Sequence, residues 1–278
     1  MDISTATRAD LATILDWAAA EGWNPGLDDG AAFHATDPEG FLVGHLGGTP
    51  VTAISVVRQG PDQAFLGLFI TRPEHRGKGY GQRIWEAGMT RMAGRTVGLD
   101  GVEAQQGRYA GQGFETAFTT TRHGGVITPP AGAPSPLTPC DATHLPELLA
   151  LDREAMGHDR SAYLSAWLTA APTRRTHLLI EDGRIRAFAT HRRCREGAKI
   201  GPLMADDVAT AETLLTSVAA LGGGGTVYVD IPDTQQAFGQ IAQALGLAPV
   251  FRTARMYHGP APALSLDRVF GLTTLELG

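Results

Sequence analysis

Residues 65–85 read Phe-Leu-Gly-Leu-Phe-Ile-Thr-Arg-Pro-Glu-His-Arg-Gly-Lys-Gly-Tyr-Gly-Gln-Arg-Ile-Trp, which predicts a strand, a glycine-rich turn and an amphipathic helix. Glycines at 77, 79 and 81 permit positive φ and close approach of a ligand to the backbone. Free N–H groups and the macrodipole at the start of the helix favour an anion, and Arg76 and Lys78 add positive charge. The spacing matches neither a Walker A loop nor a GxGxxG motif. We predict a pyrophosphate-binding turn, the alternative being a tight connector.

The turn resembles the (R/Q)xxGx(G/A) loop of the GNAT superfamily of acetyl-CoA-dependent N-acyltransferases. The resemblance implies that the pyrophosphate is bound by the turn itself, that is by Arg76, Gly77, Lys78, Gly79, Tyr80 and Gly81. It also implies that the preceding strand splays from a parallel strand at 96–99. Leu68, Phe69 and Ile70 of the preceding strand would then offer backbone groups to the pantetheine arm.

A second segment, Tyr109-Ala-Gly-Gln-Gly-Phe114, resembles the YxxxGF pattern of the same superfamily. In that family the tyrosine lies near the thioester sulfur and often acts as the general acid. A helix tyrosine beside Gly-Phe also fits plain core packing with its hydroxyl at the rim. The strand at 65–71 contains no acidic residue, although many relatives carry a general base there. The base therefore stays unassigned, with a water relay as one option.

The chain is predicted to divide at residues 124–139, which hold five prolines and three glycines and suit an extended connector. Domain one would comprise residues 1–123 and domain two residues 140–278. In the first domain the apolar patterns predict an early strand, two helices, an antiparallel meander, a helix, a strand, a helix and a last strand. The early strand is expected at 3–7, the two helices at 9–20 and 29–35, and the meander at 41–46, 51–58 and 64–71. The next helix should run from the glycine turn to about 93, followed by a strand at 96–99, a helix at 103–110 and a strand from 114.

The second half repeats this order at a shift of about 130 to 134 residues, which places Leu145 on Leu11 and Asp230 on Asp100. We predict a mixed α/β fold (α+β mixed sheet) of two tandem GNAT-like domains, each a largely antiparallel sheet with a splayed parallel pair and flanking helices. The whole chain, including the tail 270–278, resembles two-domain GNAT proteins whose second domain is degenerate. Asp206 and Asp207 replace the glycines and cations of the first turn, so no second CoA site is expected.

Candidates for the acceptor side are Trp23, Asp28, Asp29, Asp100 and Glu103. The carboxylates suit an ammonium group and Trp23 suits a cation–π contact, but helix starts and core packing explain the same residues. The run Gly222–Gly225 is predicted to be a helix-to-strand turn. Arg192, Arg193 and Arg195 beside a hairpin turn at 196–197 are predicted to form a solvated edge.

Composition narrows the classes of protein. The 278 residues carry 23 basic and 29 acidic side chains, a net charge of −6, so a nucleic-acid partner is not expected. No apolar run approaches a membrane span and the first residues lack a basic leader, so a cytoplasmic protein is expected. No histidine pattern suggests a metal site. Cys140 and Cys194 are expected to be separate thiols, with one bridge as the alternative.

The resemblance implies an enzyme that transfers an acetyl group from acetyl-CoA to a primary amine by direct attack. The acceptor would be a small molecule or a peptide, bound between the two halves. The alternative is a non-catalytic CoA- or small-ligand-binding sensor module. The sequence leaves the oligomeric state and the acceptor open.

Overall fold

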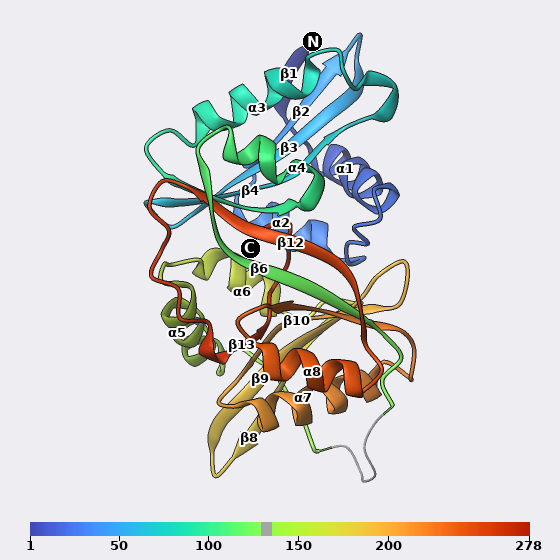
Figure 1. The fold of residues 1–278 in the computed structure, drawn as a ribbon, viewed down its shortest axis with the longest axis vertical. Helices are drawn as coiled ribbons and strands as arrows, with labels where there is room; N and C mark the ends of the chain where they lie inside the picture. The colour runs from blue at the N-terminus through green and yellow to red at the C-terminus, as the bar shows by residue number, and fades with distance from the viewer. Residues whose placement is uncertain (129–134) are drawn as a thin grey trace.

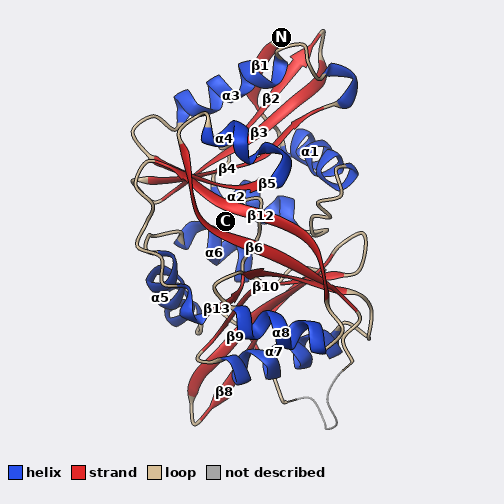
Figure 2. Cartoon of the chain, in the orientation of Figure 1, coloured by secondary structure: helices blue, strands red, loops and turns tan. Residues whose placement is uncertain are grey.

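The computed structural model describes residues 1–128 and 135–278, and these form one continuous mixed sheet with helices packed against it (Figures 1 and 2). The first half contains β1 (Asp2–Thr5), α1 (Arg8–Ala20), α2 (Asp29–Thr36), β2 (Phe41–Leu46), β3 (Thr49–Gln59), β4 (Gln63–Thr71), α3 (Tyr80–Arg91), β5 (Thr96–Val102), α4 (Glu103–Ala110) and β6 (Phe114–Gly125). The second half contains β7 (Thr138–Pro139), α5 (Leu145–Met156), α6 (Ser161–Leu168), β8 (Arg174–Glu181), β9 (Arg184–Arg193), β10 (Ala198–Ala205), α7 (Val208–Leu221), β11 (Val227–Pro232), α8 (Gln236–Ala244), β12 (Ala248–His258) and β13 (Val269–Gly271).

The predicted duplication is confirmed, because the run from α1 to β6 recurs in the same order from α5 to β12. The predicted meander β2–β3–β4 is antiparallel, and α4 has the expected bounds. Residues 129–134 of the predicted connector lie outside the described residues; on either side of them, 124–125 end β6 and 138–139 form β7.

The two halves exchange their last strands. The strand order is β1-β2-β3-β4-β5-β12-β6-β11-β10-β9-β8-β7, so β12 from the second half lies between β5 and β6 of the first. In turn, β6 pairs antiparallel with β11 of the second half. In Figure 1 the long strands β6 (green) and β12 (red) cross the middle of the molecule side by side. The sheet of each half is therefore completed by a strand of the other.

Each exchanged strand carries an arginine that forms a buried ion pair with the aspartate opposite it. Arg255 of β12 is in register with Asp100 of β5, and their closest side-chain atoms are 2.7 Å apart. Arg122 of β6 is in register with Asp230 of β11, also at 2.7 Å. The predicted equivalence of Asp100 and Asp230 thus has a structural meaning: both aspartates hold the partner half's strand.

Helices from the two halves also pack together near the centre. The ring of Phe33 in α2 stacks on Trp167 of α6, with 6.0 Å between centroids and 13° between planes. Both side chains are fully buried, which gives the junction a hydrophobic core of its own. The halves are therefore joined by apolar packing as well as by exchanged strands.

One prediction about the second half is wrong. Arg193 and Arg195 are exposed beside the predicted hairpin turn, but Arg192 is only 1% exposed and lies in the interior. Its Nη1 donates to the carbonyl oxygen of Thr273 at 2.7 Å, and its Nε lies 3.5 Å from a carboxylate oxygen of Asp29. Strand alternation turns Arg192 inward, and these partners make the buried charge tolerable.

Two other predictions, on the 222–225 turn and on the cysteines, are confirmed. The run 222–225 joins α7 to β11 as a turn. Cys140 and Cys194 are both free thiols, half-buried and buried respectively.

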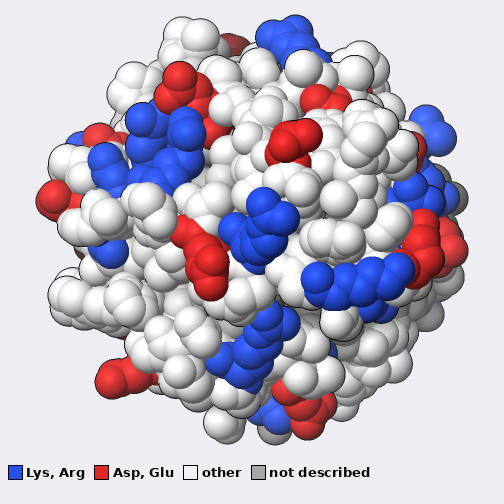
Figure 3. All heavy atoms as spheres, turned by 90° about the horizontal axis from the view of Figure 1, so that it is seen from above, with Lys and Arg blue, Asp and Glu red and all other residues white. Residues whose placement is uncertain are grey.

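Within the described residues no helix is long and apolar enough to cross a membrane. On the face seen from above in Figure 3, Lys and Arg side chains lie among Asp and Glu side chains, with broad uncharged areas between them.

Candidate active site

A cavity of about 640 Å³ lies between the halves and is lined by both. The first half contributes the glycine turn, residues 66–71 of β4, the end of β5, part of α4 and the loop after α1. The exchanged strands contribute Arg122 from β6 and Phe251 and Thr253 from β12, and the segment after β13 contributes Leu275 and Glu276. The volume falls in the range of small-molecule sites.

The cavity opens where β4 and β5 separate. The two strands pair in parallel only from Gln63↔Thr96 to Leu66↔Leu99. Leu68 then takes a positive φ of 44°, which turns β4 away from its neighbour. Since pairing with β5 ends at this point, the edge of β4 that faces away from β3 has no strand partner at Leu68, Phe69 and Ile70, which line the cavity. The splay predicted from the sequence is confirmed.

The glycine turn forms one end of the cavity at the start of α3. Gly77 and Gly79 have φ of 73° and 81°, a region that favours glycine, and Gly79 is the N-cap residue. Within the described residues, the N–H groups of residues 77–79 have no hydrogen-bond acceptor. They join the free N–H groups of the first helical turn, so the turn presents an uncompensated positive end to the cavity.

The cations of the turn are placed differently from one another. Arg76 lines the cavity, donates from Nε to the carbonyl of Thr71 at 2.9 Å and forms an ion pair with Glu21. The amine of Lys78 instead turns back to the carbonyl oxygen of Glu74 at 2.8 Å. Neither Lys78 nor Tyr80 lines the cavity.

Tyr109 of α4 lies in the cavity wall, as the YxxxGF pattern requires. Its ring is stacked on Trp85 with 5.6 Å between centroids, and the residue is 9% exposed. Burial raises the pKa of the Tyr109 hydroxyl, and nearby Arg108 offsets only part of that rise. The hydroxyl is therefore protonated near neutral pH and able to donate a proton.

The acceptor-side candidates are not all brought together. Trp23 and Asp100 line the cavity, whereas Asp28, Asp29 and Glu103 do not. Glu103 is exposed at the start of α4, which fits the alternative interpretation of a solvated helix start.

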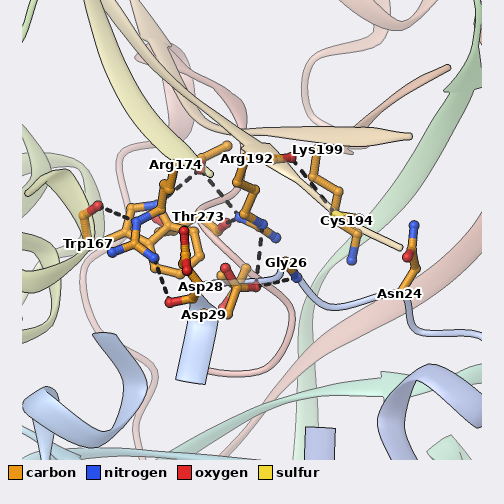
Figure 4. A network of polar contacts seen from close by, with 12 residues as sticks. Asn24, Gly26, Asp28, Asp29, Trp167, Arg174, Arg192, Cys194, Lys199 and Thr273 are labelled. Carbon is orange, nitrogen blue, oxygen red and sulfur yellow. Dashed lines mark hydrogen bonds and ion pairs between the residues drawn. The ribbon is translucent and has the colours of Figure 1, made fainter. Parts of the chain in front are cut away.

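Asp28 and Asp29 are engaged inside the junction, as Figure 4 shows, which corrects their predicted place in the cleft. The carboxylate of Asp28 accepts from the N–H and hydroxyl of Thr173, both at 2.6 Å. Asp29 is fully buried and accepts from the N–H of Gly26 at 2.7 Å beside Arg192. These carboxylates hold the loop after α1 against the second half.

The loop carrying Trp23 is held by two buried cations. The carbonyl oxygen of Trp23 accepts hydrogen bonds from Nζ of Lys199 on β10 at 2.8 Å and from Nη1 of Arg122 at 3.2 Å. Burial, together with nearby Arg122, lowers the pKa of Lys199 to about 8. In the part of the chain that the structure describes, no group of three or more His, Cys, Asp or Glu residues is arranged to hold a metal.

Glu276 is one of several cavity residues that sequence reasoning missed. It is 4% exposed and lies in the segment after β13, far in sequence from both motifs. Its only local signal is a single charge within the apolar tail Leu-Thr-Thr-Leu-Glu-Leu. That signal does not indicate a position in space.

Two domain descriptions match the chain. Residues 8–114 match "Acetyltransferase (GNAT) family" and residues 148–271 match "Acetyltransferase (GNAT) domain". Over nearly its full length the chain is also similar to the holothin acyltransferase of Pseudoalteromonas sp. (strain SANK 73390), with 31% identity over 98% of this chain and 93% of that protein. The chain belongs to the GNAT acyltransferase family. The predictions of two GNAT domains and of an acyltransferase are thereby confirmed.

Solved structures share the GNAT fold along the whole chain. A putative acetyltransferase from Pyrococcus horikoshii has a TM-score of 0.84 at 20% identity, covering 100% of this chain and 95% of that one. A tandem GNAT protein from the clavulanic acid biosynthesis pathway has a TM-score of 0.64 at 16% identity, covering 93% and 99%. At these identities the likeness concerns the fold.

The second GNAT domain has its own splay, but the chain fills it. β10 and β11 pair in parallel only from Ala198↔Val227 to Ile200↔Val229, and β13 then pairs with β10. The N–H of Leu272 donates to the carbonyl of Asp230 on β11 at 2.9 Å, so the segment bridges the opening. At the following junction Asp206 pairs with Arg186, and Asp207 caps α7 through the N–H of Thr210.

We therefore expect one CoA per chain. The groove of the second half is occupied by residues 269–272, and its helix start is capped by a carboxylate that repels phosphate. Isothermal titration calorimetry with CoA should give a stoichiometry of one. A second equivalent that disappears on mutation of residues 204–212 would contradict this expectation.

Proposed function

We propose that this GNAT protein transfers an acetyl group from acetyl-CoA to a primary amine by direct attack. The observation that carries the proposal is the cavity, which joins the glycine turn, the splay of β4 and the hydroxyl-bearing Tyr109 to an end built from both halves. The first half would hold the donor. The second half and the exchanged strands would supply the walls of the acceptor end.

The donor assignment is supported by the chemistry of the two open backbone regions. The free N–H groups of the turn suit a pyrophosphate, and the unpaired edge of β4 suits the amides of a pantetheine arm. Arg76 and Arg108 line the same end and add positive charge. When bound, acetyl-CoA supplies the activated carbonyl carbon of its thioester.

Direct attack is supported by what lines the acceptor end. Neither Cys140 nor Cys194 is among the cavity residues of the described chain, so no thiol is placed to carry an acyl group. Trp23, Phe251 and Leu275 provide apolar contact surface, and Glu276 provides a carboxylate suited to an ammonium group. The cavity therefore favours an acceptor that is partly apolar and carries an amine.

Release of free thiol from acetyl-CoA across a panel of amines tests the proposed function. The panel includes holothin, because the similar Pseudoalteromonas protein is named for that acceptor. Amine-dependent thiol release with formation of the N-acetyl product supports the proposal. CoA binding without turnover on any amine would favour the sensor alternative, and turnover only with a longer acyl-CoA would correct the donor.

Replacement of Gly79 by tryptophan should abolish measurable CoA binding. Nothing lies within 4 Å of a Cβ at this position, so the indole would project into the cavity end where the pyrophosphate is expected. Gly94→Trp is the matched control, since Gly94 has a φ of 80° and equally open space but lies away from the cavity. Calorimetry that shows equal CoA affinity for Gly79→Trp and Gly94→Trp would refute the loop assignment.

A further inference from the structure

The segment after β13 delivers a side chain from the second half into the acyl site of the first. After bridging β10 and β11, the chain passes against the bulged part of β4. A Cβ at Gly67 would overlap the backbone oxygen of Glu276, so this approach requires glycine. The side-chain amide of Gln59 donates to the carbonyl of Leu277 at 2.6 Å. Glu276 is therefore held firmly opposite the splay.

The carboxylate of Glu276 lacks the partners that a buried charge normally has. The residue is 4% exposed and lines the cavity together with Tyr109 and residues 66–68. Its Oε2 is buried and, within the described residues, has no hydrogen-bond partner. A buried and unsatisfied carboxylate costs free energy, so a group that fills the adjoining cavity and donates to it would recover that cost.

The surrounding charges are arranged in pairs that leave two groups over. Asp100 pairs with Arg255, Asp230 with Arg122, and Asp29 with Arg192. Glu276 and Lys199 have no ion-pair partner within 4.0 Å among the described residues, and Lys199 donates to a backbone carbonyl instead. Charged groups on five elements interact electrostatically with Glu276. They are Asp29 (α2), Asp100 (β5), Arg122 (β6), Arg192 (β9) and Lys199 (β10).

We propose that Glu276 is the catalytic base of the acyl transfer and binds the acceptor as its ammonium ion. The inference rests on the proposed function and supplies the carboxylate that β4 lacks. A residue of the second half thereby completes the active site of the first. The acceptor class that follows is an amine protonated at neutral pH, with an apolar body beside Trp23, Phe251 and Leu275.

The proton balance of the step is complete. Glu276 accepts one proton from the ammonium group and later releases it to solvent. The neutral nitrogen then attacks the thioester carbonyl, so a C–N bond forms and the C–S bond breaks. Tyr109 donates its hydroxyl proton to the departing sulfur, and the second proton lost from the amine nitrogen restores that hydroxyl. The products are the amide, free CoA and one proton in solution.

Glu276→Gln tests the proposal, because the amide keeps the shape of the side chain but cannot accept the proton. On an amine that the wild type acetylates, kcat should fall about 10²- to 10⁴-fold. The affinity for CoA should change less than twofold. Glu154→Gln, at an exposed position on α5, is the control and should match the wild type.

A second readout separates chemistry from structure. The loss of kcat in Glu276→Gln should shrink for a weakly basic amine that is already neutral at the assay pH, and Glu276→Asp should retain part of the activity. A purely structural role would lower the rates on both amines equally, and that result would overturn the proposal. So would wild-type kcat in Glu276→Gln. A wild type inactive on every amine would instead refute the proposed function.

Discussion

Replacement of Tyr109 by phenylalanine is expected to lower kcat about 10- to 10⁴-fold while CoA affinity stays nearly unchanged. Phenylalanine keeps the ring that stacks on Trp85 and whose centroid lies 6.2 Å from that of Phe114, so only the hydroxyl is removed. Within the described residues no hydrogen bond acts on that hydroxyl, so its loss should scarcely change stability. The thiolate would then leave without its proton donor.

Steady-state kinetics on an acceptor found in the amine panel measure this effect, and calorimetry measures CoA binding in parallel. Tyr228→Phe is the matched control, because Tyr228 lies on β11 away from the cavity. If Tyr109→Phe keeps wild-type turnover, Tyr109 belongs to the core packing around Trp85. An acetyl thioester whose leaving thiol has a lower pKa than the thiol of CoA should partly restore the variant's rate, because a better leaving group needs less help from an acid.

The features that were predictable from the sequence are those encoded by residues close together along the chain. The glycines at 77 and 79 specify positive φ, and the apolar stretch 41–46 predicts a strand of the same bounds as β2. The turn, the meander and the splay of β4 depend on such local preferences and on a motif whose residues are adjacent. Local chemistry was therefore sufficient to predict the glycine turn and the splay of β4 that line the cavity.

The exchange of β6 and β12 could not be predicted in the same way. β6 and β12 hold equivalent positions at the end of the repeated element order. The backbone hydrogen bonds of a strand do not depend on which half supplies the neighbouring strand, so either partner would fit the sequence. The arginine in each strand and the aspartate opposite are separated by 155 and 108 residues. No local periodicity connects positions so distant, although the repeated aspartates at 100 and 230 were visible.

The acceptor end was misjudged for a related reason. Asp28 and Asp29 lie at the start of α2, as predicted, but their carboxylates contact Thr173 and Arg192 of the second half. Conversely, Glu276 enters the cavity because β13 directs the chain through the second splay and past Gly67. Which carboxylate reaches the site is decided by tertiary topology and not by the sequence around each residue.

Replacement of Arg255 by methionine should lower the free energy of unfolding by about 3 to 5 kcal/mol. The Asp100 carboxylate accepts from its Nε at 2.9 Å and its Nη2 at 2.7 Å, with side chains 1% and 0% exposed. Burial opposes the charge on Arg255, but Asp100 and Tyr257 together outweigh burial and raise the pKa of the guanidinium. Without the Arg255 guanidinium, the Asp100 carboxylate is left buried and unpaired where β12 pairs with β5.

Urea unfolding of three variants separates the ion pair from its packing. Arg255→Met also loses contacts with Phe65 and Phe118, over whose rings the guanidinium lies at 4.8 and 5.4 Å. The double variant Asp100→Asn with Arg255→Met loses the same contacts but leaves no unpaired charge, so it should be more stable than Arg255→Met alone. Arg91→Met breaks a pair with Glu39 whose side chains are 29% and 66% exposed, and should cost at most about 1 kcal/mol. If Arg255→Met costs no more than Arg91→Met, the exchanged strand is not held by this pair, and apolar packing such as that of Phe33 on Trp167 must join the halves instead.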